Sequence, residues 1–277
     1  MAVDVAHYED FCLTTDEVLA SIGEALSAGT PLSLSRLGHA EMAVLSHHLS
    51  PRDWPMQRFI AYSGVRRFEP STVRRLVAAY TAVDIVGLVP GRGHPDGPRT
   101  KQLLRAFHIQ PKQVCDAWVT HRLAERDSFS HLLSQTRLIL VGRRAEEASS
   151  ILAGRGIVPV AIYSLEGMES LDATLTAIER GPRMELVLLA AGVPAAVAAP
   201  ELAGRTGCVA VDFGHALDLL IDGAGFDYPK LEKSWWLGQG GGDRRPGRAK
   251  APGSPGRRGR RPRLRRRASR SLRAKKP

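Results

Sequence analysis

Arg36, His39 and Glu41 place a guanidinium, an imidazole and a carboxylate within a stretch of six residues. Imidazole and carboxylate side chains bind divalent metals, and arginine neutralises phosphate. Glu41 also has a structural interpretation, because an acidic side chain in the first turn of a helix can cap its backbone N–H groups. These residue types leave two hypotheses open: a site for a phosphate ligand with a divalent cation, or an ordinary helix start.

The elements that would position these side chains are a strand followed by a helix. Residues 32–37 alternate apolar and polar side chains, which is the period of a strand. Apolar side chains in residues 39–49 recur every three or four positions, which is the period of a helix. The period changes at Gly38, and free backbone N–H groups and the helix dipole favour phosphate at such a junction.

Three later turns carry further candidates, and each turn follows a predicted strand. They contain Gly142 with Arg143 and Arg144, Gly192 with Pro194, and Asp212 with His215. Because the carboxyl ends of parallel strands meet at one edge of a sheet, we expect these residues to lie beside Arg36 and Glu41. Together they suit a nucleotide diphosphate held with Mg²⁺ or Mn²⁺ better than a dinucleotide redox cofactor.

Taken one at a time, these candidates also have structural interpretations. Arg36 would pair with an acidic neighbour, Asp212 would cap the following helix, and His215 would be a core histidine bonded to a carbonyl. Two other chemistries are disfavoured. The sequence contains no Gly-x-Ser-x-Gly elbow of a serine hydrolase. Residues 90–98 contain a Gly-x-Gly loop, but prolines stand where the helix of a dinucleotide-binding loop should begin.

The order of the predicted elements indicates an α/β fold. Strands are predicted for residues 32–37, 82–89, 137–141, 157–163, 184–190 and 208–211. Helices are predicted for residues 14–28, 39–49, 71–80, 100–107, 118–133, 145–153, 170–180, 195–203 and 216–221. Residues 50–70 are predicted to form a loop, either a lid over the site or ordinary surface packing. Strand–helix units that repeat about every 25 residues predict a mainly parallel sheet flanked by helices.

The positive charge of the chain is concentrated at its C-terminal end. The 277 residues include 39 Lys and Arg against 28 Asp and Glu, a formal net charge of +11. Residues 239–277 hold 16 of the basic residues and one acid, which leaves 23 basic and 27 acidic residues in 1–238. We expect a mildly acidic folded domain over residues 1–238. Residues 239–277, rich in Gly, Pro and Arg, cannot bury a core and are expected to be a disordered basic tail.

Three interpretations of this basic tail remain open. It could bind a polyanion such as nucleic acid, anionic lipid or an anionic glycan. It could be solvated and have no specific role, or it could be an out-of-frame translation of a GC-rich gene end. The first interpretation gives one alternative function, a polyanion-binding protein that acts through its tail.

Cysteine use and hydropathy indicate a cytoplasmic protein. Cys12, Cys115 and Cys208 lie far apart and form no CxxC pair, so we expect reduced thiols. The first ten residues lack the apolar region of a signal peptide. The most apolar run, residues 186–203, is interrupted by glycine and proline and fits a strand, a turn and a helix better than a transmembrane segment.

Six segments, in this order along the chain, resemble the GT-D-fold glycosyltransferases of bacteria. They are residues 35–41, 61–65, 82–87, 138–143, 186–194 and 211–215. The resemblance covers roughly residues 14–222. It implies a single Rossmann-like domain that transfers a sugar, of the hexosyltransferase type, from a nucleotide-sugar to a hydroxyl acceptor with a divalent metal, Mn²⁺ or Mg²⁺. A UDP-sugar is the expected donor, and a glycan or glycoprotein of the cell surface is the expected acceptor.

The first motif departs from the family's pattern. The family carries Asp-x-Glu within Arg-x-Gly-Asp-Gly-Glu, and here Arg36 and Glu41 match, whereas His39 replaces the Asp and Ala40 replaces the second Gly. His39 either substitutes as a metal ligand or weakens metal binding. In the second case the chain would be a catalytically impaired relative that binds a nucleotide-sugar or glycan.

The resemblance and the turn positions together give a set of expected roles. The expected catalytic residues are Glu41, Asp212 and His215, and the expected metal ligands are Glu41 and His39. The residues expected to bind the donor are Arg36, Gly38, Ser63, Gly142, Arg143, Gly192 and Pro194.

Overall fold

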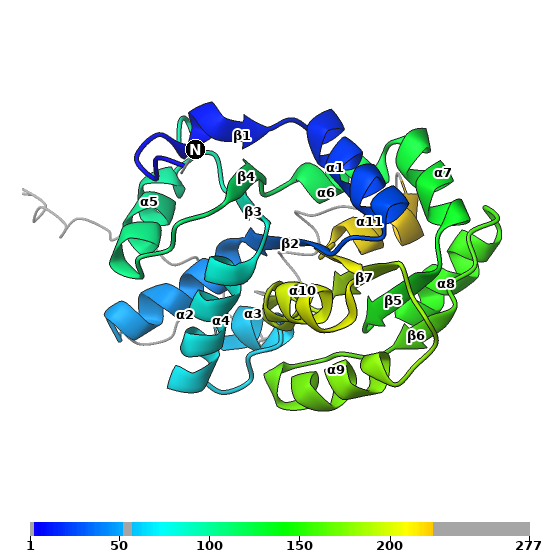
Figure 1. Cartoon of the computed structure of the whole chain (residues 1–277). Helices are drawn as coiled ribbons and strands as arrows, with labels where there is room; N and C mark the ends of the chain where they lie inside the picture. Colours follow the sequence, from blue (N-terminus) through cyan, green and yellow to red (C-terminus); the bar gives the residue numbers. More distant parts are fainter. Residues whose placement is uncertain (1–2, 52–56, 224–277) are drawn as a thin grey trace, which may run out of the picture. The chain divides into compact units, whose positions relative to one another are not determined.

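The structure, a computed structural model, describes residues 3–51 and 57–223 (Figure 1). These residues form an α/β domain around an eight-stranded sheet in the order β1-β4-β3-β2-β8-β7-β5-β6. Every pair of neighbouring strands is parallel. The prediction of a parallel sheet flanked by helices is therefore confirmed.

The sheet and its helices alternate along the chain. The strands are β1 (Cys12–Leu13), β2 (Leu32–Leu37), β3 (Ile85–Leu88), β4 (Gln113–Asp116), β5 (Leu138–Gly142), β6 (Ala161–Tyr163), β7 (Leu186–Ala190) and β8 (Val209–Asp212). The α-helices are α1 (Thr15–Ala28), α2 (His39–Leu49), α3 (Gln57–Tyr62), α4 (Pro70–Ala82), α5 (Gly97–Ala106), α6 (Val119–Ala124), α7 (Asp127–Gln135), α8 (Ala145–Ala153), α9 (Leu171–Glu179), α10 (Val193–Thr206) and α11 (Ala216–Asp222). Two 3₁₀ turns, η1 (Tyr8–Phe11) and η2 (Met168–Ser170), complete the described elements.

Two hydrophobic cores lie on the two faces of the sheet. Side chains of α2, α4, α5, α9 and α10 pack on one face, and those of α1, α6, α7, α8 and α11 pack on the other. Figure 1 shows the arrangement of these helices around the sheet. Strand β5 shows why its sequence is continuously apolar: Ile139 and Val141 enter the first core, while Leu138 and Leu140 enter the second. A strand covered on both faces has no position for a solvated side chain.

The strand order places β2 and β8 side by side at the centre of the sheet. From β2 the chain builds outward through β3 and β4. It then crosses to the other half and returns through β5, β7 and β8 to the side of β2. Ligands of open α/β sheets bind outside the carboxyl ends of the strands at such a reversal of direction. The first and last candidate motifs of the sequence follow these two strands.

Several predicted elements differ from the structure. Strand β4 was not predicted, because its four residues include the exposed Gln113 and lack a clear apolar pattern. The predicted helix 118–133 is two helices, since Arg126 adopts an extended backbone conformation between α6 and α7. The predicted loop 50–70 contains α3. Helix α5 begins at Gly97, three residues before the prediction, because Pro98 stands in its first turn, where its missing N–H costs nothing.

The basic tail, residues 239–277, lies outside the described residues, so the predicted boundary at residue 238 stays a prediction. Among the residues that are described, no helix is both long and apolar enough to cross a bilayer. Cys12, Cys115 and Cys208 are all free thiols, and the last two are buried.

Candidate active site

Two small cavities meet at the carboxyl edge of β2 and β8. One, the α2 cavity, has a volume of about 80 Å³ and is lined by Glu41, His39 and Trp118, among others. The other, the α11 cavity, has a volume of about 70 Å³ and reaches toward Arg143 and Asp218. Four residues line both cavities, namely Arg36, Ser63, Gly192 and His215. A wider hollow of about 770 Å³ lies beyond the amino ends of β7 and β8, away from these residues.

Arg36 and Asp212 form a buried ion pair between β2 and β8. Asp212 Oδ1 lies 3.1 Å from Arg36 Nη2, and Asp212 Oδ2 accepts the backbone N–H of Arg36 at 3.1 Å. Asp212 is only 1 % exposed. Burial raises the pKa of the Asp212 carboxyl, and the charge of Arg36 opposes this effect. Both carboxylate oxygens of Asp212 are therefore engaged by Arg36.

Gly214 makes room for the guanidinium of Arg36. Its φ is +50°, and a Cβ at this position would lie 1.7 Å from Arg36 Nη2. Any other residue would therefore both strain the backbone and displace the guanidinium. The turn formed by residues 212–215 thus leaves space for the guanidinium of Arg36.

Glu41 is a buried carboxylate at the start of α2. Its Oε2 accepts the backbone N–H of Gly38 at 3.0 Å, so the predicted capping role is present in the structure. Burial raises the pKa of Glu41 to about 7, and the nearby charge of Asp212 adds to the shift. Glu41 also lines the α2 cavity, so capping does not remove it from the site.

His215 is held by a carboxylate that sequence reasoning missed. Its Nδ1 lies 2.9 Å from Oδ2 of Asp218, one turn later in α11. Burial raises the pKa of Asp218, but the contacts with His215 and Arg144 outweigh it and leave the pKa lowered. An ionised carboxylate can only accept, so Nδ1 must donate, and the lone pair of the neutral ring is on Nε2.

Arg144 lines the α11 cavity and also supports this arrangement. It forms ion pairs with Asp218 at 2.7 Å, Asp222 at 2.9 Å and Glu147 at 2.8 Å. Its charge is therefore already compensated by three carboxylates, which disfavours the phosphate role considered for it from the sequence.

Arg143 and Tyr62 form the outer wall of the α11 cavity. The Arg143 guanidinium lies 4.1 Å from the centre of the Tyr62 ring, and its Nη2 donates to the Tyr62 carbonyl at 2.7 Å. The Tyr62 ring stacks on His215 with their centres 6.2 Å apart. Arg143 is thus fixed at the cavity, and no carboxylate among the described residues forms an ion pair with it.

Gly192 and Pro194 pack directly against the segment that carries Ser63. A Cβ on Gly192 would lie 2.4 Å from the Ser63 carbonyl oxygen, and that oxygen accepts the Val193 N–H at 2.9 Å. Gly64 similarly lies against the Pro194 ring. These contacts join the start of α10 to residues 63–64, whereas Gly142 approaches the Ala190 carbonyl and lines neither cavity.

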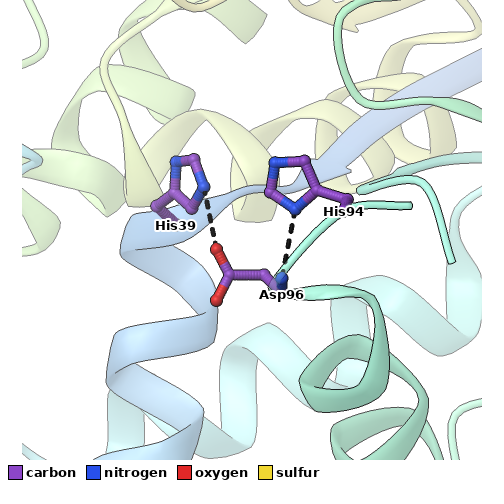
Figure 2. A group of neighbouring side chains, drawn as sticks. All are labelled: His39, His94 and Asp96. Carbon is purple, nitrogen blue, oxygen red and sulfur yellow. Dashed lines mark hydrogen bonds and ion pairs between the residues drawn. The ribbon is translucent and has the colours of Figure 1, made fainter. Parts of the chain in front are cut away.

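The structure therefore brings most of the predicted residues to one edge. Arg36, Gly38, Glu41, Ser63 and His215 line the cavities, together with the predicted His39, Arg143 and Gly192. His39 faces Asp96 at 3.2 Å, and His94 lies beside them, so that one ligand atom from each residue falls within 4.8 Å of the others (Figure 2). Sequence reasoning missed Tyr62, Trp118, His121 and Asp218. Only Asp218 had a local signal, its helical i+3 spacing from His215.

Solved structures with the same fold belong to one group of proteins. A structure described as the highly conserved domain of unknown function 1792 with a distinct glycosyltransferase fold is 16% identical, with a TM-score of 0.52, and the match covers 80% of this chain and 82% of that one. A new glycosyltransferase of the same domain from Streptococcus sanguinis is 17% identical, with a TM-score of 0.52, and the match covers 78% and 86%. At such identities the likeness shows the fold.

No curated protein matches the sequence. A family match extends over three quarters of the chain and includes both cavities and the residues that line them. Residues 13–220 match the GT-D fold-like domain, and the chain belongs to that family.

Proposed function

We propose that this protein is a glycosyltransferase that moves a sugar from a nucleotide-sugar to a hydroxyl acceptor. The observation that carries the proposal is the shared wall of the two cavities, since Arg36 and His215 both line both of them. A cation next to an oriented imidazole suits a reaction in which an anionic diphosphate leaves and a hydroxyl loses its proton. Family membership and the glycosyltransferase described among the structural relatives support the same reaction.

The donor diphosphate would bind at the positive side of this wall. Arg36 and Arg143 supply charge, and α2, whose N-terminus favours an anion, begins at the same edge. The Nε of Arg36 is buried and has no hydrogen-bond partner among the described residues. Neutralising the departing diphosphate lowers the barrier to cleavage of the bond between the anomeric carbon and the phosphate oxygen.

His215 would act as the general base. As the acceptor oxygen bonds to the anomeric carbon, its proton passes to Nε2 of His215, and the diphosphate leaves with the electron pair of the broken bond. Asp218 stabilises the imidazolium that results. Asp212 positions Arg36, and Glu41 holds the start of α2 and is a further candidate for contact with the donor or a cation.

Binding of the donor is tested by a thermal-shift titration of the full chain with UDP and UDP-sugars, with NAD as the control. A ligand that binds only the folded state raises the melting temperature according to its concentration and affinity. We expect a shift with UDP that is lost in Arg36→Met and absent with NAD. No shift with UDP or any UDP-sugar would contradict the proposed donor.

A binding protein without turnover is the second candidate, and one observation favours it. His39 stands where the family that the sequence resembles has Asp. UDP binding without sugar transfer or donor hydrolysis would favour this candidate.

A further inference from the structure

We propose that His39, His94 and Asp96 form a metal site at the rim of the α2 cavity, and that it takes a transition-metal cation such as Zn²⁺ or Mn²⁺ in preference to Mg²⁺. The site differs from the pair Glu41 and His39 expected from the sequence. Two of its three ligands come from the loop between β3 and α5, which the sequence motif does not include.

The three side chains already converge on one point (Figure 2). His39 Nε2 lies 3.2 Å from Asp96 Oδ2, and Nδ1 of His94 accepts the backbone N–H of Asp96 at 3.1 Å. One ligand atom of each residue lies within 4.8 Å of the other two. Donor atoms bound at about 2.1 Å to one tetrahedral ion lie roughly 3.4 Å apart, so the side chains must move closer together. Because the lone pair of His94 accepts the Asp96 N–H, that hydrogen bond breaks when His94 binds a metal.

The carboxylate of Asp96 does not make the hydrogen bond that is usual at its position in the chain. Asp96 is the N-cap residue of α5, a position where aspartate normally accepts a backbone N–H of the first turn. No such side-chain bond is found for it in the described structure, and the carboxylate faces His39 instead. An N-cap aspartate that gives up this bond and lies between two imidazoles has the placement of a metal ligand.

The site is rigidly supported and partly shielded from water. Arg99 of α5 donates from Nε to Ser46 Oγ of α2 at 2.9 Å, which joins the helix that begins with His39 to the helix that follows His94 and Asp96. The Trp118 ring lies 5.5 Å from the His94 ring and 6.3 Å from the His39 ring, between centres. An apolar ring beside the ligands strengthens electrostatic binding, because it excludes water from one side.

The chemistry of the ligands selects the metal. Imidazole nitrogen suits zinc and other transition metals, whereas Mg²⁺ prefers oxygen ligands and retains its water molecules. One carboxylate and two neutral imidazoles leave a bound divalent cation with net positive charge. The starts of α2 and α5 add positive potential that opposes cation binding, and the Asp96 carboxylate offsets it.

The role of the bound metal in sugar transfer rests on the proposed function. His39 also lines the α2 cavity with Arg36, so a cation held there would share in neutralising the donor diphosphate. The existence of the site does not depend on sugar transfer, and it is tested by binding alone.

The test uses untagged full-length protein, stripped of metal and titrated with Co²⁺ and Zn²⁺ by calorimetry and visible absorption. We expect one ion per chain, a Co²⁺ spectrum typical of mixed nitrogen and oxygen ligands, and no displacement by excess Mg²⁺. His94→Ala and Asp96→Asn should each weaken binding at least about tenfold. His131→Ala, which changes an exposed histidine on α7, should bind as the wild type does.

The site would be overturned if the wild type showed no stoichiometric binding. Unchanged binding by both His94→Ala and Asp96→Asn, in protein whose circular dichroism shows it to be folded, would overturn it as well. Loss of binding in Glu41→Gln with full binding in His94→Ala would also overturn it, because the ligands would then be those expected from the sequence. Metal binding without sugar transfer supports the site and contradicts the proposed function, so the two failures are distinguishable.

Discussion

Asp212 holds Arg36 at two points, the guanidinium and the backbone N–H, and so joins the carboxyl ends of β8 and β2. The pair is almost fully buried, and Tyr80 adds a bond of 2.8 Å from its hydroxyl to the Arg36 carbonyl. The site is thus built on two neighbouring central strands, and its principal cation is fixed before any ligand binds.

Removing the charge of Asp212 should destabilise the fold. Asp212→Asn leaves Arg36 buried without its counter-charge, and breaking a buried ion pair from one side costs about 3 kcal/mol or more. Urea denaturation measures this loss. Glu166→Gln is the matched control, because its pair with Arg66 is more than half exposed and should contribute less than about 1 kcal/mol. Equal effects of the two changes would refute the importance assigned to the buried pair.

Gly214 should be required for its space as well as for its backbone conformation. Gly214→Ala places a Cβ against Arg36 Nη2, and we expect loss of UDP binding together with lower stability. Gly207→Ala separates the two causes, since Gly207 has a φ of +73° but nothing within 4 Å of the added Cβ. It should show only the backbone strain, about 1 kcal/mol, and bind UDP normally. If both variants bind UDP alike, the steric argument is wrong.

Asp218 should control turnover through the tautomer of His215. Asp218→Asn allows the amide to donate to Nδ1, which moves the lone pair away from Nε2. In an analogous triad the same exchange lowers kcat by about 10⁴. We expect a fall in kcat of at least about a hundredfold with little change in the KM of the donor. Asp222→Asn is the control, because Asp222 pairs with Arg144 but not with His215. Similar kinetics for Asp218→Asn and Asp222→Asn would exclude a role of the His215–Asp218 pair in turnover.

His121 should make the stability of the protein depend on pH. Burial lowers the pKa of His121 to about 4, and the charges of Arg36 and His215 add to the effect. Between pH 6.5 and pH 4 the unfolded chain binds a proton at this residue that the folded chain does not, so stability falls as the pH is lowered.

His121→Asn removes this proton and leaves the other titrating groups in place. From pH 7.5 to pH 5 the wild type should lose about 2 kcal/mol more than the variant in urea unfolding. The comparison between the two proteins is needed because Glu41, with its raised pKa, acts in the opposite direction. A difference that stays constant with pH would contradict the buried, neutral state of His121.

The sequence was sufficient to locate the site residues that follow β2 and β8, because the change from the period of a strand to that of a helix marks where a strand ends. It also located the glycines that these turns require. It could not predict that Asp96 faces His39, since the two residues meet only when α5 packs on α2. Trp118 could not be assigned to the site from the sequence, because it follows β4. The four residues of this strand are partly exposed and lack a recognisable pattern.

Transfer of a sugar at the wall that Arg36 and His215 line is tested most directly by mass spectrometry of the reaction products. The full chain is incubated with a panel of UDP-sugars, glycan acceptors and either Zn²⁺ or Mn²⁺. We expect a glycosylated acceptor with one nucleoside diphosphate released per transfer, and loss of both products in folded His215→Asn. Equal product formation by wild type and His215→Asn, or donor binding with no product under any condition, would contradict it.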